Sequence, residues 1–158
     1  MLVRGLAVAA VVAILDQLSK AAVLAHFTGR LPGDRETITS FFNIALTFNR
    51  GISFGLFNDG AGLNALVFSV AAAVIVAVLV YWLRRAASPF LAIAIGLIIG
   101  GAVGNVIDRL RLGAVVDFLD FHVGAYHWPA FNLADSAICI GVAAMLLDGL
   151  LLHREAHR

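Results

Sequence analysis

The sequence predicts an all-α membrane protein with four transmembrane helices and a small β-rich extracytoplasmic platform, built as one domain over residues 1–158. Three observations support this fold. Hydrophobic residues make up 61% of the chain and charged residues only 13%, well outside the usual composition of soluble domains. Four apolar stretches reach the length of about 20 residues that a spanning helix needs. Two segments between them are more polar and carry β-branched and aromatic residues.

The predicted spans cover residues 2–25, 61–83, 90–107 and 133–152. The first span begins like a signal peptide, with Arg4 ahead of an apolar run, but Asp16 and Lys20 interrupt the run and no clear cleavage site follows. We therefore interpret it as a retained helix. A short turn with Arg84 and Arg85 joins the second and third spans, and further arginines follow the fourth. The positive-inside rule then predicts that both termini are cytoplasmic.

Two segments lie at the outer ends of the predicted spans. Residues 26–60 are too long for a bare turn, and within them residues 36–57 alternate partly between apolar and polar positions, which predicts short strands. Residues 110–131 contain Tyr126 and Trp128. Because tyrosine and tryptophan favour the headgroup level, we expect this second segment to lie on the membrane surface.

Charge and cysteine content exclude other classes. The net charge is +1 and the arginines are scattered, so the chain lacks the basic stripe of a nucleic-acid-binding protein. Cys139 is the only cysteine, which rules out a disulfide within the chain. Its apolar sequence neighbours predict a buried, inert thiol.

Polar residues of the spans gather near the predicted outer ends. Ionisable groups inside a membrane are costly and usually face a bundle interior or a wet cavity. In the third span, Gly96, Gly100 and Gly104 recur every four residues, a ridge that lets a neighbouring helix approach closely, and Asp108 continues the same face. The clustered polar residues are Asp16, Lys20, Asn105, Asp108, Arg109, Asn132 and Asp135.

Several of these residues also have a purely structural interpretation. Asp16 and Lys20 are four residues apart and can form an ion pair that neutralises itself, which is the default interpretation. Asn132 and Asp135 have the spacing of a helix N-cap followed by an acidic N3 residue. Arg109 can either extend to headgroup phosphates or pair with a nearby acid.

Paired carboxylates are the most specific chemical possibility. Asp117 lies between Val116 and Phe118, and partial burial there would raise its pKa. Two carboxylates close together in a poorly hydrated site share one proton, so that one can act as base toward water and the other as acid. The candidate acids are Asp16, Asp108, Asp117, Asp120 and Asp135, and spacing alone does not choose a pair among them.

Competing chemistries have weaker support. Ser136 has only His122 and His127 nearby in sequence, without a nucleophile-elbow motif. The same histidines with Asp120 match no zinc signature. We therefore predict no metal and no cofactor.

Four ordered motifs resemble the bacterial lipoprotein signal peptidases, or signal peptidase II, over essentially the whole chain. They are DQLSK at residues 16–20, NRGISFG at 49–55, GGAVGNVIDR at 100–109 with VVDF at 115–118, and PAFNLADS at 129–136. Ile52 and Ser53 replace the family's usual pair of alanines, and Ser19 stands where threonine is common. These small changes bear on fine specificity more than on activity.

The resemblance implies roles for particular residues. Asp117 and Asp135 align with the family's catalytic aspartates, which selects a pair that spacing could not. Positions that support this pair or bind the substrate are Asn49, Asn105, Arg109 and Asn132. Positions with a structural role near the site are Asp16, Lys20, Asp108 and Gly104.

The resemblance also implies the reaction and its setting. The chain would be a monomeric, multi-pass aspartic endopeptidase of the bacterial cytoplasmic (inner) membrane, with its active site at the outer face. Its partners would be membrane lipids and diacylglyceryl-modified prolipoproteins, cleaved on the amino side of the lipidated cysteine. The outer platform and residues 56–64, with Gly55, Gly60 and Gly62 as flexible points, could form a lid over the substrate. The alternatives from other classes are a small transporter or channel subunit and a non-catalytic scaffold.

Overall fold

The computed structural model describes residues 1–51 and 61–156, which form four long helices and a four-stranded sheet. The helices are α1 (Leu2–His26), α2 (Ala61–Leu83), α3 (Pro89–Leu112) and α4 (Leu133–Ala156). All four are long and apolar enough to cross a membrane. The predicted fold class is confirmed, and the chain is a multi-pass membrane protein.

Helix α3 is the central helix and packs against the other three. Its N-terminus is capped by Ser88, whose hydroxyl accepts a hydrogen bond from the Leu91 backbone at 2.9 Å. The predicted glycine ridge lets α1 approach: a Cβ at Gly96 would overlap the backbone of Gly5, and one at Gly100 would overlap that of Ala9. Packing is thus the role of these two glycines, as expected.

The sheet is antiparallel throughout, in the order β1 (Arg35–Thr39), β2 (Phe42–Asn49), β3 (Val115–Val123) and β4 (Tyr126–His127). A bulge in β2 between Ile44 and Thr47 opposes the single residue Phe118 of β3. One face packs on the end of α1, where Val23 and Phe27 contact Leu46, Val116 and Phe118.

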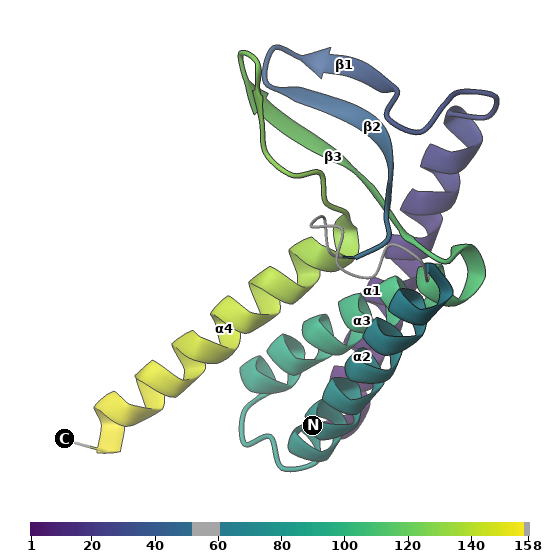
Figure 1. Ribbon diagram of the computed structural model, residues 1–158. Coiled ribbons are helices and arrows are strands. Elements are labelled where there is room, and N and C mark those ends of the chain that lie inside the picture. Colours follow the sequence, from purple (N-terminus) through teal and green to yellow (C-terminus); the bar gives the residue numbers. More distant parts are fainter. Residues whose placement is uncertain (52–60, 157–158) are drawn as a thin grey trace.

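Figure 1 shows where the site can form. The sheet lies at one end of the bundle, beside the C-terminal ends of α1 and α3 and the start of α4, while both chain termini lie toward the opposite end. Residues 110–131 contribute strands β3 and β4 to the platform, and β2 and β3 are its two inner strands. The sequence had predicted strands only in residues 36–57.

Two further details differ from the prediction. Helix α3 continues five residues beyond position 107, because Asp108 is buried and ion-paired, and it ends at Gly113 in the left-handed conformation with φ of 70°. The prediction of a buried Cys139 was wrong: its side chain is exposed on α4. In a spanning helix such a position faces lipid, so apolar sequence neighbours do not imply burial inside the protein. Ile52, Ser53 and residues 56–60 of the predicted lid lie outside the described residues.

Candidate active site

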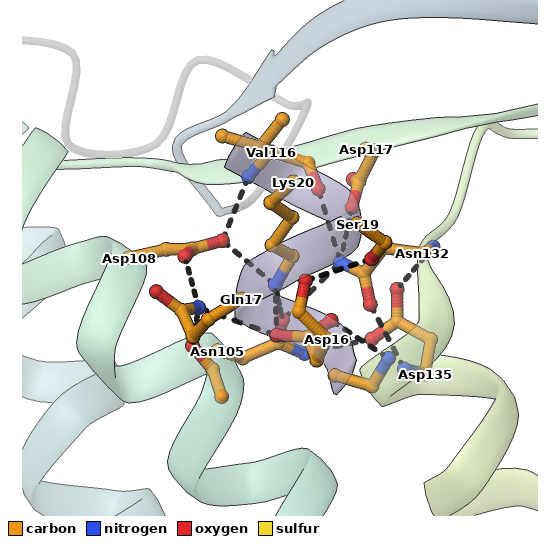
Figure 2. A network of polar contacts seen from close by, with 12 residues as sticks. Asp16, Gln17, Ser19, Lys20, Asn105, Asp108, Val116, Asp117, Asn132 and Asp135 are labelled. Atoms are coloured by element: carbon orange, nitrogen blue, oxygen red, sulfur yellow. Dashed lines mark hydrogen bonds and ion pairs between the residues drawn. The ribbon is translucent and has the colours of Figure 1, made fainter. Parts of the chain in front are cut away.

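Asn132 connects the two predicted catalytic aspartates. Its side-chain nitrogen donates to Asp117 Oδ1 at 2.7 Å, and its backbone nitrogen donates to Asp135 Oδ2 at 3.2 Å. Its side-chain oxygen accepts from the Asp135 backbone at 3.0 Å, which is the capping geometry expected from the spacing. Figure 2 shows Asn132 between the two acids. The hydrogen bonds of Asn132 therefore both cap α4 and hold Asp135 close to β3.

Two more asparagines orient the same carboxyl groups. The Asn49 amide, at the end of β2, donates to Asp117 Oδ2 at 3.0 Å. The Asn105 amide, from α3, donates to Asp135 Oδ1 at 2.8 Å. Both oxygens of each carboxyl group thus accept a hydrogen bond from a neutral donor, so their directions are fixed without a cation in contact.

Burial is the main influence on the acidity of Asp117. The side chain is 2% exposed, and burial together with the nearby charge of Asp135 raises its pKa to about 6, against the opposing effects of Asn49, Asn132 and Lys20. The predicted burial and raised pKa of this acid are both found in the structure. A carboxyl group with such a pKa can keep its proton while a neighbouring one is ionised.

Beneath this pair lies a buried lysine with two acids. Lys20 Nζ is 2.8 Å from Asp16 Oδ2 and 2.7 Å from Asp108 Oδ2, and it donates to Asn105 Oδ1 at 3.0 Å. All four side chains are buried. The expected ion pair of Asp16 and Lys20 is present, but Lys20 also binds α3. Because Asn105 accepts from Lys20 and donates to Asp135, the lysine fixes which way that amide faces.

Close helix packing makes this network possible. A Cβ at Gly104 would overlap the Asp16 carboxylate, and one at Gly101 would overlap the Ala134 backbone. Asp16 Oδ1 in turn accepts from the Ala134 backbone nitrogen at 3.0 Å, so a carboxylate from α1 satisfies a free amide in the first turn of α4. Small residues on α3 therefore hold the start of α4 in place.

Arg109 lies beside the pair without an ion pair to it. Its guanidinium carbon lies over the Phe68 ring, 5.5 Å from the ring centre, and the group donates a long 3.4 Å hydrogen bond to the Asn105 backbone carbonyl. Its charge still interacts with Asp135 and Asp117. Within residues 1–51 and 61–156, neither of those two acids forms an ion pair.

Two contributors were missed by sequence reasoning. The Gln17 amide donates to Asp108 Oδ1 at 2.8 Å and to the Gly104 carbonyl at 3.2 Å. The Val116 backbone donates to Asp108 Oδ2 at 3.1 Å, which ties α3 to the strand that carries Asp117. A signal existed for Gln17, which lies between Asp16 and Lys20 in the polar interruption of the first span, but none existed for a backbone amide.

The structure separates Asp120 from the pair. Its carboxylate accepts from Asn43 at 2.9 Å, contacts His127 at 2.8 Å and lies 3.5 Å from Arg35. Burial acts to raise the pKa of Asp120, but the hydrogen bonds from Asn43 and His127 and the charge of Arg35 outweigh it, so the pKa is lowered. The rings of His122 and His127 stack at 4.8 Å. This cluster stabilises the far end of the sheet.

Paired, amide-oriented carboxyl groups at one end of four membrane-spanning helices define the class of membrane aspartic peptidases. The comparisons agree: a family model described as signal peptidase (SPase) II matches residues 8–151. A lipoprotein signal peptidase of Paraburkholderia phymatum is 48% identical over 154 residues, covering 96% of this chain and 90% of that one. One of Burkholderia vietnamiensis is 44% identical over 146 residues, covering 92% and 86%.

The chain therefore belongs to the signal peptidase II family, and its activity is that of a lipoprotein signal peptidase, as predicted. Solved structures agree with this fold. A bacterial membrane enzyme determined by the in meso method at 1.9 Å has a TM-score of 0.78 and 34% identity, covering 92% of each chain. Another at 2.3 Å has a TM-score of 0.75 and 35% identity, covering 92% of this chain and 87% of that one. The transporter and scaffold alternatives are not supported.

Proposed function

We propose that Asp117 and Asp135 are the catalytic pair, and that the protein removes signal peptides from diacylglyceryl-modified prolipoproteins by cleaving on the amino side of the lipidated cysteine. The observation that carries this proposal is the shared partner Asn132, which donates to one acid through its side chain and to the other through its backbone. Asp16 and Asp108 are also joined, through Gln17, but both are ion-paired with Lys20. Among the acids considered from the sequence, only Asp117 and Asp135 share a partner and form no ion pair within residues 1–51 and 61–156.

The chemistry follows from one proton shared by the pair. The ionised carboxylate removes a proton from a water molecule, whose oxygen attacks the carbonyl carbon, while the protonated acid donates its proton to the carbonyl oxygen. The tetrahedral intermediate then collapses: one of its hydroxyl groups gives its proton to the ionised carboxylate, the carbon–nitrogen bond breaks, and the leaving amine takes a proton from the other carboxyl group, so the pair again holds one proton. A pKa of about 6 for Asp117 supports a pair that keeps one proton near neutral pH, and such a pair titrates as a unit.

The supporting residues divide the remaining work. Asn49, Asn105 and Asn132 hold the carboxyl groups in place, and Arg109, close to both acids but not paired with them, is available to hold the substrate backbone. Asp16, Lys20, Asp108 and Gly104 keep α1, α3 and α4 in register beneath the pair.

The location of the site suits a lipidated substrate. The pair lies where β3 meets the start of α4, at the helix ends instead of mid-span. Acyl chains can stay in lipid there while the scissile peptide reaches a polar pocket. The turn between α2 and α3 lies at the opposite end of the bundle. It contains the exposed Arg84 and Arg85, so we propose that both termini are cytoplasmic and that the site is at the outer face of the inner membrane. We also propose a functional monomer, as the resemblance implies.

The test is cleavage of a lipidated precursor by variants purified in detergent. Asp117→Asn and Asp135→Asn should each abolish cleavage while the protein remains folded. Asp120→Asn is the matched control, since it changes an equally buried acid on the same strand and should keep most of the activity. Full activity in either of the first two variants would remove that residue from the pair.

Two further measurements define the substrate and the mechanism. A precursor that lacks the diacylglyceryl group should not be cleaved, and equal cleavage of both forms would contradict the substrate assignment. A chelator such as EDTA should have no effect, since the carboxyl pair activates water without a metal ion; inhibition would require a metal-dependent mechanism instead.

A further inference from the structure

The end of the sheet farthest from the helices carries an exposed apolar surface, here called the tip patch. Its residues are 41% to 82% exposed and surround a hollow of about 320 Å³, together with His122. They are Phe41, Phe121, Val123, Tyr126 and Trp128. Soluble surfaces rarely gather this many exposed aromatic side chains in one place, so the patch needs a partner.

An aromatic contact connects the tip patch to the segment just before α4. Phe121 stacks on Phe131 with ring centres 5.9 Å apart, and Phe131 lies two residues before α4 begins. Further along α4, Ile140 and Leu146 are exposed in the part of the helix that is apolar enough to span a membrane. In Figure 1, β2 and β3 run across the direction of α4 and carry the tip sideways, beyond the bundle. The tip therefore extends over the lipid next to α4.

Its chemistry fits the boundary between headgroups and acyl chains. Tyrosine and tryptophan prefer this level because each combines an apolar ring with one polar group. The nearest acid, Asp120, is 2% exposed and held by Asn43 and His127, so it does not present a free charge to the patch. Half-exposed Arg35, bound to the same acid, lies close enough to meet a lipid phosphate.

We infer that the tip patch inserts shallowly into the outer leaflet and is a second membrane contact beside the four spans. Beyond the cleavage reaction itself, this contact would fix the depth of the catalytic site. Strand β3 carries Val123 at the tip and Asp117 near its other end, on the same face. Six residues of strand span about 20 Å, so anchoring one end sets the height of the other above the bilayer.

The chain's two tryptophans allow a direct measurement. In Trp82→Phe, the only remaining tryptophan is Trp128, so the fluorescence of this variant reports the tip. The protein is reconstituted into phosphatidylcholine and phosphatidylglycerol vesicles that contain lipids brominated either near the headgroup or near the chain end. We expect quenching about twofold stronger from the shallow bromines, as for a group about 5–10 Å deep, and little quenching by aqueous iodide.

A matched variant provides the reference. Trp128→Phe leaves only Trp82, at the other end of the bundle on α2, and its quenching calibrates a tryptophan at the end of a spanning helix. Both variants should retain cleavage activity, which shows that they are folded.

Other results would overturn the inference. Strong iodide quenching of Trp128 without lipid quenching would mean that the tip is in water. Protection from iodide only after precursor is added would identify the patch as a substrate-binding surface. Protection that disappears when the protein is diluted into excess lipid would identify a contact between two copies of this chain.

Discussion

Replacing Asp117 by asparagine should stabilise the folded protein at neutral pH even as it abolishes cleavage. The reason is the cost of ionising a buried acid. In the unfolded sheet this side chain is in water and has its ordinary pKa of 3.8, whereas in the folded protein burial and the charge of Asp135 raise its pKa to about 6. The difference of roughly two units corresponds to about 3 kcal/mol.

The sign of the pH effect follows from linkage. A raised pKa means that the folded state binds the proton more tightly, so the contribution of Asp117 to stability is fully present below pH 3.8 and is lost as the pH rises through about 6. Asparagine does not ionise, so the variant does not lose stability in this way as the pH rises. Relative to the wild type, Asp117→Asn should therefore gain up to about 3 kcal/mol between pH 4 and pH 7, an upper limit because rearranged hydrogen bonds to Asn49 and Asn132 offset part of it.

The assay is thermal unfolding of detergent-purified protein at several pH values between 4 and 7. The informative quantity is how the difference in unfolding free energy between variant and wild type changes with pH, because effects of the substitution that do not depend on pH cancel. At neutral pH the variant's unfolding temperature should rise by about 6–12 °C at most. Asp120→Asn is the control with the opposite sign: the pKa of Asp120 is lowered, so its stabilising contribution is already complete above pH 3.8 and this variant should lose stability by a nearly constant amount.

A stability difference for Asp117→Asn that stays constant from pH 4 to pH 7 would refute the reasoning, because the folded and unfolded states would then bind the same number of protons at this position. A gain toward low pH would reverse the inferred direction of the shift.

Three further predictions concern the packing beneath and beyond the pair. Gly104→Ala should destabilise the protein by about 1–3 kcal/mol and lower kcat/KM, because the added methyl group overlaps the Asp16 carboxylate; an unchanged unfolding temperature would contradict this. Lys20→Met leaves two buried acids without their cation and should cost about 3–5 kcal/mol in denaturant unfolding, so a neutral effect would exclude a charged role. Ser88→Ala removes the N-cap of α3 and should cost about 1 kcal/mol in unfolding while leaving cleavage kinetics unchanged.

The spans could be predicted from the sequence because apolar length is a local property. The end of α3 could not. An apolar criterion stops at the first charge, Asp108, but the helix continues to Leu112 because Lys20, from another helix, neutralises that charge inside the protein. The true end is marked by Gly113 in the left-handed conformation, a weaker signal in a sequence with 15 glycines.

Strand β3 was missed because both of its faces are mixed. Val116 and Phe118 pack on α1, yet Asp120 lies on the same face. Asp117 lies on the other face, with Phe121 farther along toward the tip. The alternation of apolar and polar residues that identifies a half-buried strand is therefore absent. On each face of β3, the residues near the helices and those toward the tip differ in polarity.

The identity of the aspartate pair came from the resemblance, because pairing depends on contacts between distant parts of the chain. Asn49 reaches Asp117 across 68 residues, and Asp16 reaches the Ala134 backbone across 118. Spacing within one helix can suggest an N-cap, as it did for Asn132, but it carries no information about which strand the capped helix meets.

The distribution of hydrogen-bond donors suits the shared proton that we propose for this site. Lys20 has three N–H groups, and all three are used, on Asp16, Asp108 and Asn105. The ammonium group is thereby held by Asp16 and Asp108, while the pair above it receives only neutral amides. A cation in direct contact with Asp117 would favour its ionised form and lower its pKa, and the pair would then lose the shared proton. Neutral donors fix the geometry of the pair without favouring loss of the shared proton.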